Sequence, residues 1–471
     1  MKHFTRITIL LFYLVLFTSS GTAQCFSSVS SVYAHVNAKK TDGTYWGWGA
    51  NTIGMLGLPD LADRYSPVPI PNSSDWQSVF SGRFNSFIIK NNGTLWGTGY
   101  NLSGILGVGT TQTVYPQYTQ VGTAANWKQV QSNYFSIGLK TDGTMWGWGQ
   151  NSGNEMGDNT CCANRLSPGQ IGTDTDWKAI AISAVGAGFA IKNNGTLWGW
   201  GTNIAGLLGD NLLPARPYPT QHNPDTDWSK ISVGHAHILA LKTNGTLWAW
   251  GSGGTGATGD GLGSAFNRYI PRQIGTDNTW IDISTGVEFS MAIKSDGTLW
   301  GWGSNDVNQL GDGTNTNRPL PVQIGTAADW QSVAASYQNT IALKTDGSLW
   351  TWGANDYGQL GNGSLATATT PTNIPVSGCV LATESFGETQ DMVVVSPNPA
   401  QNELTIHYTG EKVVNTISIY DLSGREVYTS QPMAGNSFTG TLNIAQLESG
   451  SYVLLLKNDT KTVAARKWIK K

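Results

Sequence analysis

The segment Thr141-Asp-Gly-Thr-Met-Trp-Gly-Trp-Gly149 occurs, with small changes, seven times along this chain of 471 residues. Its first glycine recurs at positions 43, 93, 143, 195, 245, 297 and 347, in steps of 50 or 52 residues. A period this long and regular indicates an array in which each repeat forms one supersecondary unit. Although the length of the chain would allow several domains, the repeats therefore predict one long domain.

Each repeat contains four segments that have the pattern of short strands. An Asp-Trp segment such as 75–79 comes first, and an apolar segment that ends in lysine, such as 87–90, comes second. Asp-Gly or Asn-Gly follows at once, which is the strongest short signal for a β-hairpin. The Trp-Gly-Trp segment is third, and after a glycine-rich loop a segment such as 321–325 is fourth. Four short strands per repeat are typical of a propeller blade.

These repeats resemble those of the regulator of chromosome condensation family. The resemblance is carried by [Asp/Asn]-Gly-Thr-Leu-Trp-x-Trp-Gly followed by Asn-x-x-Gly-x-Leu-Gly, most clearly in Asn305-Asp-Val-Asn-Gln-Leu-Gly311 and Asn355-Asp-Tyr-Gly-Gln-Leu-Gly361. It covers residues 25–379 and implies an all-β fold with a seven-bladed β-propeller. Six of the seven repeats have Trp-x-Trp, and Thr98 is the exception. We expect these indole rings to pack between adjacent blades.

Residues 1–24 have the features of a secretory signal peptide. Lys2 and Arg6 precede an apolar run over residues 7–17, and Gly21-Thr-Ala23 is a small-residue cleavage site. Cys25 leaves a lipoprotein open as an alternative. No later segment approaches the roughly 18 apolar residues of a transmembrane helix, so the sequence predicts an exported protein with no transmembrane segment.

The composition changes after the repeats. We interpret residues 380–391 as a polar linker and 392–471 as a small β-sandwich, because alternating apolar residues and turn signals recur there. Ser396-Pro-Asn-Pro-Ala400, Ile419-Tyr-Asp-Leu-Ser-Gly-Arg425 and a Gly-x-Tyr strand resemble the C-terminal sorting domain of the type IX secretion system. The resemblance implies a Gram-negative host of the Bacteroidetes type, recognition by that secretion machinery, and removal of this domain. The mature protein would be released or held at the outer-membrane surface.

The four cysteines suggest two separate arrangements. Cys25 and Cys379 occupy the same place in the repeat at the two ends of the array, so in a closed ring they would be neighbours. We expect a disulfide between them, with two free thiols as the alternative; an exported location permits the bond. Cys161 and Cys162 could form a vicinal disulfide or pair between chains.

The sequence offers no catalytic set and predicts neither a metal site nor a cofactor. His235 and His237 could share one face of a strand and ligate a metal, but His35 and His237 occupy the same place in the repeat, which favours a hydrogen-bonded structural role. The acidic loop from Asp312 resembles a calcium loop but lacks the closing glutamate. A net charge of −3 provides no basic field for nucleic acid.

The repeats differ most at the turn before each lysine-ending strand. Equal register in every repeat places these residues in one ring on one face, and aromatic residues and arginine are enriched there, as at binding hot spots. The candidate binding residues are Tyr33, Arg83, Phe84, Tyr134, His235, Glu288, Tyr337 and Gln338. The sequence thus predicts an exported or cell-surface, non-catalytic binding protein whose ligand is a protein. Two alternatives are an enzyme inhibitor or regulator and a glycan-binding surface protein.

Overall fold

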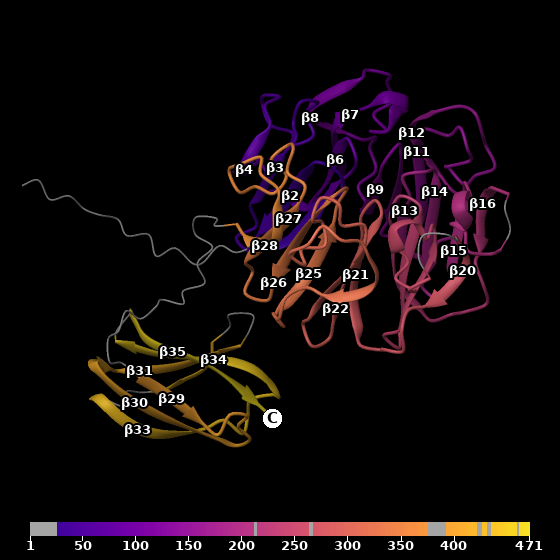
Figure 1. The fold of residues 1–471 in the computed structure, drawn as a ribbon. Helices are drawn as coiled ribbons and strands as arrows, with labels where there is room; N and C mark the ends of the chain where they lie inside the picture. The colour runs from indigo at the N-terminus through magenta and orange to yellow at the C-terminus, as the bar shows by residue number, and fades with distance from the viewer. Residues whose placement is uncertain are drawn as a thin grey trace, which may run out of the picture. The chain divides into compact units, whose positions relative to one another are not determined.

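The computed structural model describes residues 26–211, 214–262, 267–374, 392–421, 426–430, 435–458 and 461–471. The chain divides into two compact units on either side of residue 381. The first unit contains seven four-stranded antiparallel sheets, each built from four consecutive strands, and the second contains two further sheets (Figure 1). The predictions of a seven-bladed propeller and of a separate C-terminal β-domain are therefore confirmed.

The four strands of each blade keep the order of the repeat. The first strands, which line a central channel, are β1 (Phe26–Ser31), β5 (Trp76–Ser81), β9 (Trp127–Ser132), β13 (Trp177–Ile182), β17 (Trp228–Val233), β21 (Trp280–Thr285) and β25 (Trp330–Ala335). The second are β2 (His35–Lys40), β6 (Asn85–Lys90), β10 (Phe135–Lys140), β14 (Ala187–Lys192), β18 (His237–Lys242), β22 (Phe289–Lys294) and β26 (Asn339–Lys344).

The third strands carry the Trp-x-Trp motif. They are β3 (Tyr45–Gly49), β7 (Leu95–Tyr100), β11 (Met145–Gly149), β15 (Leu197–Gly201), β19 (Leu247–Gly251), β23 (Leu299–Gly303) and β27 (Leu349–Gly353). The outer strands are β4 (Arg64–Pro69), β8 (Val114–Gln120), β12 (Arg165–Gln170), β16 (Arg216–Gln221), β20 (Arg268–Gln273), β24 (Arg318–Gln323) and β28 (Ala368–Asn373). Three short 3₁₀ turns precede outer strands: η1 (Leu102–Gly104), η2 (Ile204–Gly206) and η3 (Gly254–Gly256).

The hairpin between second and third strands explains the most constant letters of the repeat. In the third blade, Asp142 Oδ1 accepts hydrogen bonds from the backbone nitrogen of Thr144 at 3.0 Å and from its hydroxyl at 2.6 Å. The same hydroxyl accepts a bond from Trp146 Nε1 at 2.9 Å. Gly143 has φ +79°, and a Cβ there would clash with the carbonyl oxygen of Thr175 in the next blade. The hairpin turn between the second and third strands thus uses each constant residue of the motif: aspartate or asparagine, glycine, threonine and tryptophan.

The second tryptophan of each motif joins neighbouring blades, as expected. Trp148 is fully buried, and its Nε1 donates to the carbonyl oxygen of Ile105 in the preceding blade at 2.8 Å. Thr98 keeps this link through its hydroxyl, which donates to the carbonyl oxygen of Gly54 at 2.8 Å. The ring of Tyr118 lies beside Gly57, where an indole lies in the other blades, so an outer-strand tyrosine replaces the missing tryptophan.

Side-chain and backbone contacts close the ring between the seventh and first blades, which lie side by side in Figure 1. Trp48 Nε1 donates to the carbonyl oxygen of Gln359 at 2.9 Å. The hydroxyls of Ser31 and Ser336 are 3.0 Å apart, and the nitrogen of Phe26 bonds to the carbonyl oxygen of Gly347 at 3.2 Å. Each blade is one continuous stretch of chain, so closure requires no strand exchange between the ends.

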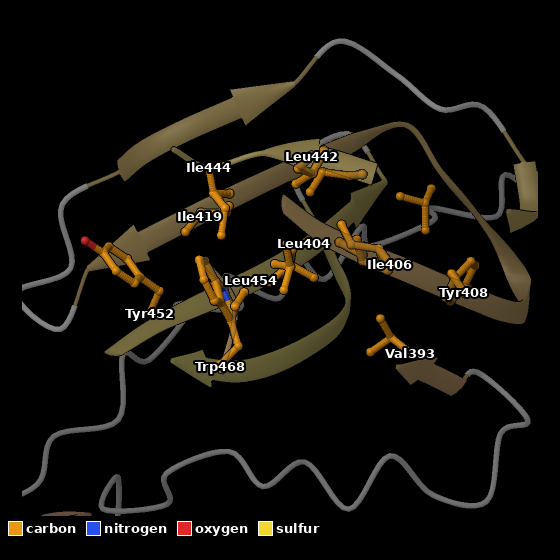
Figure 2. Close-up of a cluster of buried hydrophobic side chains, with 14 residues drawn as sticks. Val393, Leu404, Ile406, Tyr408, Ile419, Leu442, Ile444, Tyr452, Leu454 and Trp468 are labelled. Atoms are coloured by element: carbon orange, nitrogen blue, oxygen red, sulfur yellow. The ribbon is translucent and has the colours of Figure 1, made fainter. Parts of the chain in front are cut away.

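The C-terminal unit is a sandwich of two sheets. One has the order β29-β30-β33 and the other β32-β31-β34-β35. The strands are β29 (Met392–Ser396), β30 (Glu403–Val414), β31 (Thr416–Asp421), β32 (Glu426–Ser430), β33 (Gly435–Asn443), β34 (Gly450–Asn458) and β35 (Lys461–Lys470). Figure 2 shows Leu404 and Ile406 of one sheet facing Ile419 and Leu454 of the other, with Trp468 buried among them. This core contains no residue of the propeller.

Several predictions fall outside the described residues. These are the signal peptide at 1–24, the disulfide between Cys25 and Cys379, and the linker at 380–391. Cys161 and Cys162, by contrast, form a vicinal disulfide in an exposed loop, which is one of the two arrangements that the sequence left open.

Candidate binding face

The turns between first and second strands meet at one mouth of the central channel. The channel has a volume of about 450 Å³, and Tyr33, Arg83, His235 and Tyr337 are among the residues that line it. The ring expected from the sequence therefore exists as a structural feature. The last residue of each turn does not face outward, because it begins the second strand and is buried. The buried residues are His35, Asn85, Phe135, Ala187, His237, Phe289 and Asn339.

Four of the predicted binding residues surround the fifth, Arg83. Its guanidinium carbon lies 4.9 Å from the ring centre of Tyr134, 5.1 Å from that of Phe84, 5.3 Å from that of Tyr33 and 5.9 Å from that of Tyr337. The rings also contact one another, with centroids 4.6 Å apart for Tyr33 and Tyr337 and 6.1 Å apart for Phe84 and Tyr134. We call these five residues the Arg83 cluster. Residues from the seventh, first, second and third blades compose it.

Burial raises the pKa of the Tyr33 phenol, and the neighbouring Tyr337 adds to this shift. The phenol therefore stays neutral at physiological pH and can donate a hydrogen bond. Tyr134 is 41% exposed, whereas the other members of the cluster are half-buried. The cluster thus offers aromatic surface and one cation to the solvent at the channel mouth.

Arg83 differs from the other arginines of the propeller in its partners. Five of them begin outer strands, and each forms an ion pair with an aspartate of its own blade: Arg64 with Asp60, Arg165 with Asp158, Arg216 with Asp210, Arg268 with Asp260, and Arg318 with Asp312. Arg272 is exposed on β20. Arg83 is half-buried, its Nε is shielded from solvent without a hydrogen-bond partner, and no carboxylate of the described residues pairs with it.

An apolar pocket of about 370 Å³ adjoins the Arg83 cluster and shares Phe84 and Tyr134 with it. Its other walls come from the end of β7 and from the loops that follow the third strands of the first three blades. They are Ile53, Tyr100, Leu102, Ser103, Ile105 and Gln150. Leu102 is 55% exposed, and the rings of Phe84 and Tyr100 are 6.1 Å apart. None of these six residues was predicted from the sequence, although Tyr100 was a usable signal, because the other repeats have a small or polar residue at its position.

Three other predicted residues lie apart from the Arg83 cluster. His235 is exposed at the channel mouth in the fifth blade, and Glu288 is exposed in the sixth. The side chain of Gln338 is half-buried, and its carbonyl oxygen accepts a bond from Ala354. The structure therefore gathers five of the eight candidates and leaves these three along the rest of the mouth.

The histidines have the structural role that the repeat suggested. His35 Nε2 lies 2.9 Å from the hydroxyl of Ser86, and His237 Nε2 lies 3.0 Å from that of Ser290. Burial lowers the pKa of both imidazoles to about 4. His237 is buried at the start of β18 and His235 is exposed in the preceding turn, so the two do not share a strand face. Across the described ranges, no group of three potential metal ligands occurs.

The acidic loop from Asp312 is a structural turn. Asp312 Oδ1 accepts bonds from the nitrogen and hydroxyl of Thr314 and from the side chain of Asn305, while Oδ2 pairs with Arg318. The carboxylate that suggested calcium is therefore committed to the loop and to the outer strand of its own blade.

The blades and the channel mouth define a class of protein, the seven-bladed propellers built from repeats of the regulator of chromosome condensation. The chain belongs to the RCC1-like domain family, whose model matches residues 136–398, and the RCC1 repeat model matches residues 42–89. Residues 394–471 match the secretion system C-terminal sorting domain, which marks an exported substrate of the type IX secretion system.

Solved structures share the propeller fold. Human WBSCR16 is 17% identical over 71% of this chain and 95% of its own, with a TM-score of 0.64. Prp20p from Saccharomyces cerevisiae is 19% identical over 79% of this chain and 91% of its own, with a TM-score of 0.61. No curated protein shows significant sequence similarity to the chain. Among the helices of the described ranges, none is long and apolar enough to cross a membrane.

Proposed function

We propose that this exported propeller is a non-catalytic binding protein that engages a protein partner through the Arg83 cluster and the adjoining pocket. The observation that carries the proposal is the gathering of Tyr33, Phe84, Tyr134 and Tyr337 around one arginine at the channel mouth. Tyrosine and arginine are enriched among residues that contribute most to protein interfaces. Aromatic and aliphatic side chains supply contact area and shape, not acid–base chemistry.

The walls of the pocket favour a protein over a glycan. A sugar needs many hydrogen-bond partners for its hydroxyls, whereas the side chains of Ile53, Leu102 and Ile105 offer none. Specificity in such pockets comes from an apolar fit with a small number of polar groups, which Ser103 and Gln150 can supply. Inhibition of an enzyme would be one case of this binding mode.

We also propose that the working form is the propeller alone. It would lack residues 1–24 as a cleaved signal peptide and most of 392–471 as a removed sorting domain. The support is the match of residues 394–471 to a sorting domain and the separate core of that domain. The intact mass of protein recovered from the medium or cell surface checks this form, and a mature chain that ends at Lys471 would contradict it.

The binding proposal is tested by substitution at the exposed face. Extracellular proteins that bind the purified protein are captured and their affinities measured, first for the wild type and then for a Phe84→Ala, Tyr134→Ala double variant. Truncation of two interface hot spots costs more than about 1 kcal/mol, or about fivefold in affinity. The control is Tyr218→Ala with Leu320→Ala, which removes two side chains that are 56% and 54% exposed from the outer strands β16 and β24.

We expect the face variant to lose binding and the control to retain it, with similar melting temperatures for both. Equal binding by wild type and face variant would place the site elsewhere. A glycan array is run in parallel, and binding of a glycan that depends on Phe84 and Tyr134 would favour the glycan-binding alternative.

A further inference from the structure

Among the described residues, Arg83 is a cation without a counter-charge, and aromatic rings surround it. Four aromatic rings surround its guanidinium group, and its Nε is shielded from water. Ring faces attract a cation by only about 0.5–2 kcal/mol, and they do not satisfy N–H donors. A buried donor without a partner costs about 1–3 kcal/mol, and more when it is charged. The described residues therefore supply no acceptor for the buried Nε and no counter-charge for the guanidinium group.

The charges of the channel select the kind of acceptor. The described residues that line it include Arg83, Lys230 and His235 but no aspartate or glutamate. Lys230 already pairs with Asp282 of the neighbouring blade, so among the described lysines and arginines that line the channel Arg83 is the one without an ion pair. A guanidinium group has a planar fork of donors that matches the two oxygens of a carboxylate, and the resulting bidentate pair is among the strongest hydrogen-bonded contacts. Charge complementarity thus points to a carboxylate from the partner.

The position of the pocket extends this recognition to a second side chain. Phe84 and Tyr134 contact the guanidinium group of Arg83 and also form walls of the apolar pocket. A carboxylate on Arg83 and a group in the pocket would therefore lie next to the same two rings. In an extended chain, residues i and i+2 point to the same side and lie roughly 6.5 Å apart, so two such side chains can contact neighbouring groups on one surface.

We propose that the partner presents an extended peptide segment with Asp or Glu at one position and a bulky apolar residue two positions away. The acidic side chain pairs with Arg83, and the apolar side chain enters the pocket between Leu102 and Tyr134. This inference rests on the proposed binding function and adds the chemistry of the partner. In this arrangement Arg83 selects for an acidic side chain in the peptide, and the pocket selects for a bulky apolar one.

The test uses a random peptide library displayed on phage and selected on the purified full-length protein. We expect enriched sequences to contain Asp or Glu two positions from Leu, Ile, Met or Phe. One enriched peptide is then synthesised together with its Glu→Gln or Asp→Asn counterpart, and the affinities of both are measured for the wild type and for Arg83→Met. Methionine keeps apolar contacts with the rings and removes the charge. Arg272→Met, on the exposed outer strand β20, is the control variant.

With wild type and Arg272→Met, we expect neutralisation of the peptide acid to weaken binding at least tenfold. With Arg83→Met we expect the same neutralisation to change the affinity by less than twofold, because the peptide acid no longer has a guanidinium group to pair with. Equal sensitivity of wild type and Arg83→Met, or enriched peptides without acidic residues, overturns the pairing with Arg83. If binding of those neutral peptides still depends on Phe84 and Tyr134, the proposed binding function stands and only the proposed carboxylate recognition is refuted. If selection enriches no peptide that depends on Phe84 and Tyr134, both proposals fail.

Discussion

The indole nitrogen of Trp48 donates a hydrogen bond to the carbonyl oxygen of Gln359 at 2.9 Å, across 311 residues of chain. The same bond links consecutive blades elsewhere, for example from Trp250 to Leu207 at 2.7 Å. At Trp48 it closes the ring. A contact that elsewhere joins consecutive blades thereby joins the two ends of the propeller.

Trp48→Phe is expected to destabilise the propeller more than Trp352→Phe. Both indoles are fully buried, so both substitutions remove similar apolar volume. Trp352 Nε1 has no partner among the described residues, whereas Trp48→Phe also leaves the Gln359 carbonyl without its donor. The difference in the free energy of unfolding should be about 1 kcal/mol, measured by denaturant titration. Equal losses would show that the closing bond contributes nothing.

The contact between the seventh and first blades also depends on a glycine, Gly358. Gly358 has φ +72°, and a Cβ there would lie 2.9 Å from the Cα of Tyr65 in the first blade. Gly325 has φ +65° but open space around it, so Gly325→Ala measures backbone strain alone. Gly358→Ala should cost about 1–3 kcal/mol more than this control, because the two blades must separate. Thermal unfolding of the two variants tests this, and matching melting temperatures would exclude a tight contact.

Stability should fall in mild acid. Burial lowers the pKa of His35, His222 and His237 to about 4, below the ordinary value of 6.5. The folded state therefore binds fewer protons than the unfolded state, and stability decreases as the pH falls from about 6.5 to about 4. The measurement is the free energy of unfolding between pH 8 and pH 4. A flat profile in this window would contradict the burial of these rings.

His222 allows the contribution of one imidazole to be separated. It occupies the position of Ile70, Ile171 and Ile274 in other blades, and neither of its ring nitrogens has a hydrogen-bond partner. His222→Ile should stabilise the protein at pH 8, because it replaces a buried polar ring by an apolar side chain. At pH 4 the gain should be larger by on the order of 2 kcal/mol, because one titrating group is gone. The same gain at both pH values would assign the effect to packing alone.

Disruption of the core of the sorting domain should unfold that domain and prevent export, while the propeller stays folded. Trp468 is fully buried and stacks on Tyr452 at 5.3 Å, so Trp468→Ala should cost the small domain about 3–5 kcal/mol. We expect this variant to be retained inside the cell envelope, while Ile469→Ala, which removes a side chain that is 45% exposed, is exported normally. Immunoblots of cell and medium fractions give the readout. Normal export of Trp468→Ala would show that recognition does not need the folded sandwich.

The sequence by itself determined the number of blades, the order of their strands and the identity of the hairpin turns. These features depend on contacts within one repeat, such as the bonds among Asp142, Thr144 and Trp146, and a local pattern repeated seven times reports them reliably. It also placed eight binding candidates in one register, of which the structure brings together Arg83 and four aromatic residues.

Only the tertiary structure decided what surrounds that register. The pocket joins Ile53, Tyr100 and Leu102 to Phe84 and Tyr134, and these residues come from different segments of three blades. Tyr118 fills the space left by Thr98 from an outer strand, and Arg83 has no carboxylate partner among the described residues. Such relations depend on how blades sit against one another, because the side chains come from separate segments of the chain, such as Ile53 and Tyr134 in the pocket. A repeat pattern specifies each blade, but only packing between blades specifies the site.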